Sequence, residues 1–296
     1  MPSASRSPPP IAILLATLLC CSWGFNQVAI KFVLAEIPAL MQASIRSAVA
    51  ALVVWLWTWL RGVPILIADG THLPGLVTGI VFAIEFLLIY EGLGFTAASR
   101  ASVFLYTAPF FVVLGARWLL PAERFDAWQW LGLALSFLGL VIALGVPTPG
   151  ADKREFLGDV MLLAAGAGWG ATTLIVKASR LAHAPSEKVL LYQLVVSAPM
   201  LTVCSITFGE RLPAVPSLFA VSLVLYQSIW VVAFTFAAWV ALIQRYSASR
   251  LSVLTFLSPM FGVLAGHAIL GEPLTPAFAA AAGLVLAGLI IVNRPR

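Results

Sequence analysis

The chain has 296 residues, of which 61% are hydrophobic and only 10% are charged. Soluble domains carry roughly 25% charged residues, so the composition excludes an ordinary water-soluble protein and indicates that lipid is the solvent. A net charge of +5 would favour nucleic acid as the partner of a soluble protein. Here the basic residues separate apolar runs, which predicts loop anchors at a lipid bilayer and no nucleic-acid binding.

Ten apolar runs are long enough to cross a bilayer as helices, which takes about 20 residues each. The runs cover 10–33, 38–60, 73–93, 98–119, 127–146, 157–179, 188–208, 216–243, 248–270 and 276–293. The sequence therefore predicts an all-α integral membrane protein with ten transmembrane helices. The longest polar stretch divides it into a first unit at 1–146, a linker at 147–156 and a second unit at 157–296.

The first apolar run could be mistaken for a signal peptide, because Arg6 precedes an apolar stretch that begins at Ile11. The run continues to Leu34 without a small-residue cleavage site. Its Trp23–Lys31 piece also has a counterpart in the second half of the chain. We therefore expect a retained first membrane helix.

Two motifs of the first half recur in the second half. They are Ala98-Ser99-Arg100-Ala101-Ser102-Val103 with Pro109, repeated at Ala248-Ser249-Arg250-Leu251-Ser252-Val253 with Pro259, and Trp23-Gly24 with Lys31, repeated at Trp169-Gly170 with Lys177. The offsets of 150 and 146 residues are close to half of the chain, so we predict two copies of one unit.

The number of spans in each copy predicts how the copies are related. Five crossings per copy turn the second copy upside down, so that Arg100 and Arg250 face opposite sides of the membrane. Inverted repeats of this kind let a central site open to one side and then to the other, as secondary transporters do. With a cytoplasmic N-terminus, eleven of the 17 Lys and Arg residues lie on the inner side and five on the outer side. This bias predicts that both termini are cytoplasmic.

The motifs resemble those of the drug/metabolite transporter superfamily, EamA type. The resembling elements are the two Trp-Gly helices, the two Ala-Ser-Arg-x-Ser-Val…Pro helices, and the turn Leu270-Gly271-Glu272-Pro273-Leu274-Thr275, which has a degenerate copy at 119–124. The resemblance implies a secondary transporter of small metabolites in a bacterial inner membrane, with a central cavity between the halves. The chain is also similar to the amino-acid exporter branch that includes YddG-type aromatic amino-acid exporters.

Polar side chains within the spans are costly in hydrocarbon and are therefore candidate binding residues. Arg46 either binds a substrate carboxylate or pairs with Glu85 or a helix-end carbonyl group. Glu85 either binds a substrate ammonium, carries a coupling proton, or is the partner of Arg46. Gln42 shares a helix face with Arg46, and Gln193 lies at a similar depth. Asn26 lines the cavity or bonds across helices.

Aromatic side chains form a second candidate site. Tyr226, Trp230 and Phe234 recur every four residues along one helix. Such a stripe is core packing, lipid-facing surface, or a wall that stacks on an apolar or aromatic substrate. Three further aromatic residues would extend such a wall: Tyr90, Tyr106 and Trp169.

Pro109 and Pro259 occupy the same position in the two copies, near the middle of a span. Each proline removes an intrahelical hydrogen bond and bends its helix. The two prolines are hinges for gating or fixed kinks that shape the cavity, and both interpretations stay open.

We predict a secondary transporter that exports small metabolites by alternating access, with amino acids, and aromatic or apolar ones in particular, as the favoured cargo. The alternatives are export of a nucleoside, purine, sugar-like compound or drug, a channel-like facilitator, and a non-transporting scaffold. The sequence contains no G-x-x-x-x-G-K-[ST], H-E-x-x-H or G-x-S-x-G motif, so we expect no enzyme, no metal and no cofactor. The expected partners are a small-molecule substrate and lipid, and both a monomer and a dimer are compatible with the sequence.

Overall fold

The computed structural model describes residues 6–294 except 66, 68, 97, 146–152, 272 and 275, and the side chains of residues 98 and 99 are outside this description. Within it, ten helical stretches are long and apolar enough to cross a membrane. The prediction of an all-α integral membrane protein with ten transmembrane helices is confirmed, and the predicted ends agree with the observed ends to within four residues.

The helices are α1 (Pro10–Leu34), α2 (Ala39–Leu60), α3 (His72–Leu93), α4 (Ala98–Leu105), α5 (Ala108–Leu119), η1 (Pro121–Glu123), α6 (Ala127–Leu144), α7 (Lys153–Ala178), η2 (Arg180–His183), α8 (Ser186–Thr207), α9 (Leu218–Tyr226), η3 (Gln227–Thr235), α10 (Phe236–Arg245), α11 (Ala248–Leu254), α12 (Leu257–Leu270) and α13 (Pro276–Asn293). The start of α7 at Lys153 places residues 153–156, which were assigned to the linker, in a helix. The rest of the predicted linker, residues 147–152, lies outside the described residues.

Apolar runs of this length form helices because lipid offers the backbone no hydrogen-bond partner, so the amide and carbonyl groups must pair within the segment. Local features then fix the ends. Asp126 and Gln129 form a reciprocal capping box at the start of α6. Gly271 ends α12 in the left-handed conformation, which glycine adopts without a steric penalty.

The fourth and ninth membrane spans are each interrupted by a two-residue turn, between α4 and α5 and between α11 and α12. Pro109 is the second residue of α5, and Pro259 is the third residue of α12. A proline lacks the backbone N–H that would continue the helical ladder, so the ladder breaks in front of it. The prolines therefore mark matched breaks, while their role as hinges stays a prediction.

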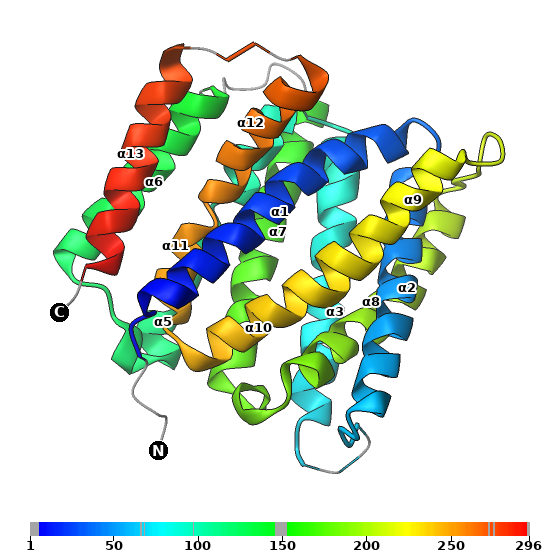
Figure 1. Ribbon diagram of the computed structural model, residues 1–296, viewed down its shortest axis with the longest axis horizontal. Helices are drawn as coiled ribbons and strands as arrows, with labels where there is room; N and C mark the ends of the chain where they lie inside the picture. Colours follow the sequence, from blue (N-terminus) through cyan, green and yellow to red (C-terminus); the bar gives the residue numbers. More distant parts are fainter. Residues whose placement is uncertain are drawn as a thin grey trace.

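The helices around the centre form two bodies. The first body contains α1, α2, α9, η3, α10, α11 and α12, in which α1 packs on α12 and α2 on η3. The second body contains α3, α4, α5, α7 and α8, in which α3 packs on α7 and α8, and α5 on α7. Helices α2 and α8 make the most extensive contact between the two bodies, and α10 also packs on α7 and α8, and α11 on α5. Figure 1 shows α1 and α10 in front of α3 and α7, and the α6–α13 pair at one edge.

Matched glycines allow close helix contacts within each body. A methyl group added at Gly24 of α1 would lie 2.6 Å from the Cβ of Phe261 and 2.7 Å from the backbone nitrogen of Gly262 in α12. A methyl group added at Gly170 of α7 would lie 2.7 Å from the Cβ of Phe111 in α5. Only a residue without a side chain fits at these distances, so α1 and α7 each contact their partner helix at backbone range.

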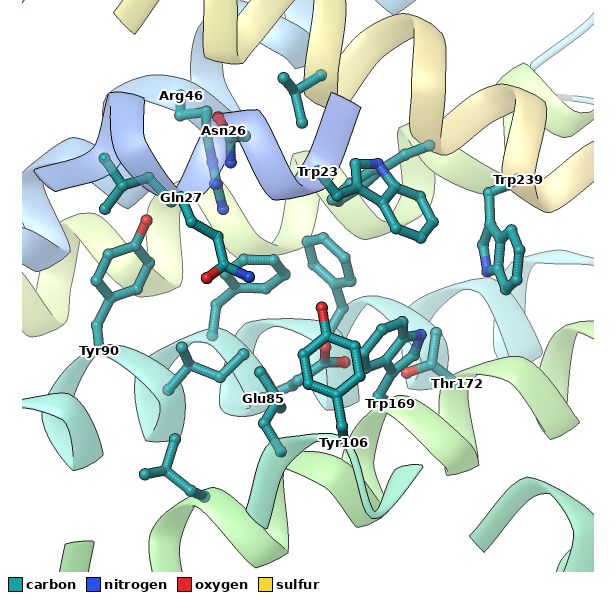
Figure 2. A pocket seen from close by; sticks show the side chains of 18 of the residues that line it. Trp23, Asn26, Gln27, Arg46, Glu85, Tyr90, Tyr106, Trp169, Thr172 and Trp239 are labelled. Atoms are coloured by element: carbon teal, nitrogen blue, oxygen red, sulfur yellow. The ribbon is translucent and has the colours of Figure 1, made fainter. Parts of the chain in front are cut away.

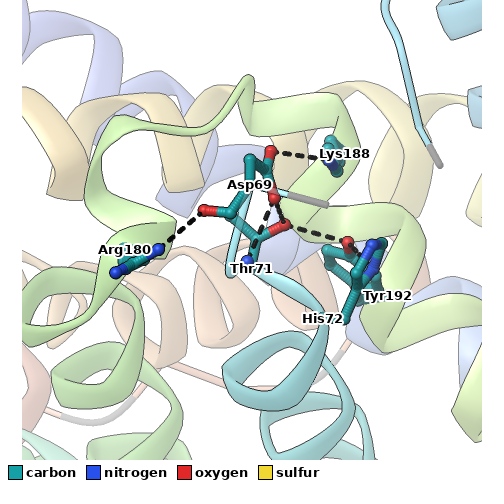
Figure 3. Close-up of polar contacts among 6 residues, drawn as sticks. All are labelled: Asp69, Thr71, His72, Arg180, Lys188 and Tyr192. Carbon is teal, nitrogen blue, oxygen red and sulfur yellow. Dashed lines mark hydrogen bonds and ion pairs between the residues drawn. The ribbon is translucent and has the colours of Figure 1, made fainter. Parts of the chain in front are cut away.

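Helix α1 begins and α13 ends on the same side of the molecule, which we call the terminal side, and the opposite side is the far side (Figure 1). On the terminal side, the loop after α2 is held by the second half of the chain (Figure 3). Lys188 of α8 donates to the carboxylate of Asp69 at 2.8 Å, and Arg180 donates to the Asp69 carbonyl at 3.3 Å. Thr71 donates to the same carboxylate and lies 3.0 Å from the hydroxyl of Tyr192.

The Lys188 ammonium and the Thr71 hydroxyl hold the pKa of the Asp69 carboxyl well below its usual range. We expect Asp69→Asn to lower the Tm at neutral pH by about 2–4 °C. Because the pKa of Asp69 is lower in the folded state, its ionised carboxylate stabilises the folded protein at pH values above about 3.9, the pKa in the unfolded chain. This contribution is lost as the pH falls through the pKa of the folded state. The Tm difference should therefore shrink below about pH 4.

Thermal unfolding of the purified protein in detergent, at neutral pH and below about pH 4, checks this expectation. Glu155→Gln is the control, because Glu155 is a partly exposed carboxylate on the far side that pairs with Arg100 at 3.4 Å. A Tm difference for Asp69→Asn that stays constant down to low pH would contradict the assignment.

Candidate functional site

A cavity of about 460 Å³ lies between the two bodies, and we call it the central cavity. Its walls come from α1, α2 and α10 of the first body, with η3, and from α3, α4, α7 and α8 of the second body. Figure 2 shows side chains from α1, α2, α3, α7 and α10 converging on the cavity. The volume lies within the roughly 300–1,000 Å³ of small-molecule sites.

Buried polar atoms without a hydrogen-bond partner gather around the central cavity. Among the described residues, six such atoms belong to cavity-lining side chains: Asn26 Oδ1, Arg46 Nε, Glu85 Oε2, Tyr90 Oη, Thr172 Oγ1 and Trp239 Nε1. Buried polar groups are nearly always paired in folded proteins. A cluster of exceptions around one cavity therefore indicates groups that are set to bind a polar ligand or water.

Arg46 supplies a cation to the lining of the central cavity. Its side chain comes from the middle of α2, is 4% exposed and points into the cavity (Figure 2). The guanidinium carbon lies 4.8 Å from the centre of the Phe86 ring, which supports the cation through its π-face. The guanidinium presents planar N–H donors that match the two oxygens of a carboxylate.

Glu85 supplies an anion from α3, and it is 6% exposed. The ion pairs found in the described part of the chain do not join Glu85 to Arg46. Figure 2 shows Glu85 and Arg46 reaching the cavity from different helices, α3 and α2. An uncompensated charge in an apolar environment is costly, so two such groups in one cavity favour a ligand that carries both charges.

Aromatic rings form most of the remaining wall. Trp23 and Trp239 pack edge to face with centres 5.3 Å apart, and Tyr106 and Trp169 do so at 5.8 Å. The Trp23 indole donates to Thr235 at 2.8 Å, which fixes the orientation of its ring. These faces suit an apolar or aromatic group of a ligand, because stacked rings gain more than their buried area alone provides.

The structure brings seven of the ten predicted binding residues to the cavity: Asn26, Arg46, Glu85, Tyr90, Tyr106, Trp169 and Gln193. Gln42 lies elsewhere, fully buried, where its amide donates to Gln227 of η3 at 3.0 Å. Tyr226 and Trp230 also lie outside the lining. Trp230 is 50% exposed and donates to Ser22, so its ring is on the outer surface of the helix bundle.

The sequence did not identify Phe236 and Trp239, which line the cavity from α10. Their spacing with Val240 and Ile243, which also line it, is that of one helix face, so a separate search for this period would have found them. The stripe from Tyr226 to Phe234 instead runs through η3, which is a π-helix. A π-helix changes the number of residues per turn, so a face extrapolated at ordinary helical spacing points elsewhere.

The two ends of the central cavity differ in exposure. At its far end, Leu34 and Leu93 line the cavity and are 41% and 37% exposed. At its terminal end, Val176, Val240 and Ile243 line the cavity and are buried. The cavity is therefore open to the far side and closed to the terminal side.

The EamA-like transporter family matches both halves of the chain, over residues 10–145 and 156–294. A solved crystal structure with 20% sequence identity has a TM-score of 0.82 and covers 97% of this chain and 98% of its own chain, which supports the fold.

Relatives of similar length are named as transporters. The uncharacterized transporter YoaV of Bacillus subtilis is 23% identical, with 95% of each chain covered. A probable amino-acid metabolite efflux pump of Salmonella typhimurium is 28% identical, with 94% of this chain and 93% of the relative covered. The uncharacterized inner membrane transporter YedA of Escherichia coli is 23% identical, with 92% and 87% covered. The chain is thus a multi-pass inner-membrane transporter rather than an enzyme, and it belongs to the EamA-like transporter family.

Proposed function

We propose that this chain is a secondary transporter that exports amino acids, with aromatic or apolar side chains favoured. The observation that carries the proposal is the presence of Arg46 and Glu85 in one cavity without an ion pair between them. An amino-acid carboxylate would bind the Arg46 guanidinium, and the ammonium would bind Glu85. The side chain would lie against the indole rings of Trp23 and Trp169. Relatives that are named amino-acid metabolite efflux pumps support this cargo class.

We also propose that the two halves are inverted repeats that work by alternating access. Support comes from the separate family matches of the halves and from the equivalent contacts that Gly24 and Gly170 make. With five spans per half, equivalent helices cross the membrane in opposite directions. With both termini in the cytoplasm, the cavity faces the outside, as it would after an exporter has released its cargo.

Flux in proteoliposomes tests the function. Vesicles that contain the purified protein and radiolabelled phenylalanine are expected to release the label faster than empty vesicles. Unlabelled phenylalanine on the other side should accelerate release, because an alternating-access carrier returns faster when it is loaded. A channel would release the label without this acceleration. Absence of flux for the amino acids, nucleosides and sugars of a substrate panel would refute the transport proposal.

A further inference from the structure

The terminal end of the central cavity is closed by polar contacts that join the two bodies. Glu123, which follows α5, accepts hydrogen bonds from the Ser247 hydroxyl at 3.0 Å and the Ser249 amide at 2.9 Å. Lys177 at the end of α7 donates to the carbonyl oxygens of Tyr246 at 2.7 Å and Gln244 at 3.1 Å. We call these six residues the terminal gate.

Every one of these contacts crosses from one body to the other. Lys177 ends α7 in the second body, and Glu123 ends η1, which follows α5 and packs on it. Their partners lie at the end of α10 and the start of α11 in the first body: Gln244, Tyr246, Ser247 and Ser249. Gln244 makes a further contact, because its amide nitrogen donates to the carbonyl oxygens of Leu181 in η2, at 2.7 Å, and of Ala184 directly after η2, at 2.9 Å. Separating the bodies on the terminal side would break all of these hydrogen bonds together.

The gate contains a buried ion pair whose two charges both have hydrogen-bond partners in the neighbouring body. The Glu123 carboxylate is 1% exposed and lies 3.9 Å from the Lys177 ammonium, which is 11% exposed. Burying either charge without partners is costly. The neighbouring body supplies those partners as a hydroxyl, an amide and two carbonyl groups. The closed position is therefore the one in which both charges have hydrogen bonds.

We propose that Glu123 and Lys177 are the gating residues of this transporter, which hold the cavity closed on the terminal side until the bodies separate. This inference rests on the alternating-access part of the proposed function and does not depend on the cargo. Breaking the gate raises the population that is open to the terminal side. The same movement lowers the population that is open to the far side.

Cysteine labelling measures the two openings separately from transport. The three native cysteines, Cys20, Cys21 and Cys204, are first replaced by serine or alanine. Val176→Cys then reports the terminal end of the cavity, and Leu34→Cys reports the far end. A membrane-impermeant maleimide is applied to sealed vesicles of each orientation, and a cleavable C-terminal tag identifies the terminal side.

Glu123→Gln and Lys177→Met are the test variants, since each removes a charge and keeps most of the side-chain volume. Each is expected to accelerate labelling of Val176→Cys from the terminal side by about tenfold or more, as loss of charged hydrogen bonds would do. Labelling of Leu34→Cys from the far side should slow. In the double variant, the rate of Val176→Cys labelling should be little higher than in either single variant, because the two residues act as one unit.

Glu155→Gln, which removes a carboxylate on the far side, is the matched control and should leave both rates unchanged. Ser247→Ala removes the hydroxyl that donates to Glu123 and caps α11, and it serves as a variant without charge loss if a charged-residue variant does not fold. Wild-type labelling of Val176→Cys in the folded variants would overturn the gate. Faster labelling in the variants of a protein that shows no amino-acid flux would support the gating role and refute only amino acids as the cargo.

Discussion

Arg46→Ala is expected to weaken the binding of a carboxylate-bearing amino acid by about 10- to 150-fold. Hydrogen bonds to charged groups contribute about 1.5–3 kcal/mol, and about 1.4 kcal/mol corresponds to a factor of ten. The Arg46 side chain is buried in the cavity wall, so bulk water does not replace the lost interaction. The concentration dependence of efflux in proteoliposomes, or calorimetric titration of the purified protein, measures the effect.

Two variants sharpen this measurement. Arg46→Lys keeps the charge and loses the planar fork of donors, so it should recover only part of the affinity. Arg61→Ala removes an arginine that is 59% exposed, pairs with Glu187 and lies outside the central cavity. Because neither Arg61 nor Glu187 lines the central cavity, the affinity of Arg61→Ala should match that of the wild type. An Arg46→Ala protein that is folded and binds normally would exclude Arg46 from the binding site.

Glu85→Gln is expected to change selectivity as well as affinity. The substitution keeps the shape of the side chain and removes its negative charge. Binding of an amino acid should weaken by about tenfold or more, because the ammonium loses a charged partner. Binding of the same compound without its amino group, such as phenylpropionate in place of phenylalanine, should change little. The ratio of the two inhibition constants in a competition assay gives the result directly.

Glu91→Gln on the same helix is the control for this experiment, because Glu91 does not line the central cavity. Equal losses for phenylalanine and phenylpropionate in Glu85→Gln would assign Glu85 a structural role. A loss that is confined to phenylalanine would place its ammonium at Glu85.

The ten spans could be predicted from the sequence because lipid imposes the same requirement on every crossing segment. An apolar run near 20 residues must be helical, and charged or glycine-rich loops mark its ends. Arg46 and Glu85 were identifiable for the same reason, since charges within such runs are rare. Their separation was not predictable, because it depends on how α2 and α3 are rotated relative to each other.

Partners from distant parts of the chain explain the other differences. The sequence places Gln42 on the Arg46 face, but its amide is taken by Gln227 in the other half of the chain. The π-helix that contains Gln227 also shifts the aromatic faces along that span, which leaves Trp230 at the surface and Trp239 in the cavity. Helix periodicity carries no information about either effect, because both arise from packing between segments.

The close contacts at Gly24 and Gly170 limit which helix movements have a low free-energy cost. Helix α1 touches α12 at backbone range, and α7 touches α5 in the same way, so sliding within either pair would force atoms into overlap. Bending at Pro259 would therefore pull α1 along with α12, together with the cavity face that carries Trp23 and Asn26. The cavity would then open and close by tilting of two stiff walls, and the rate of that movement would depend on the friction of whole helix bodies against lipid.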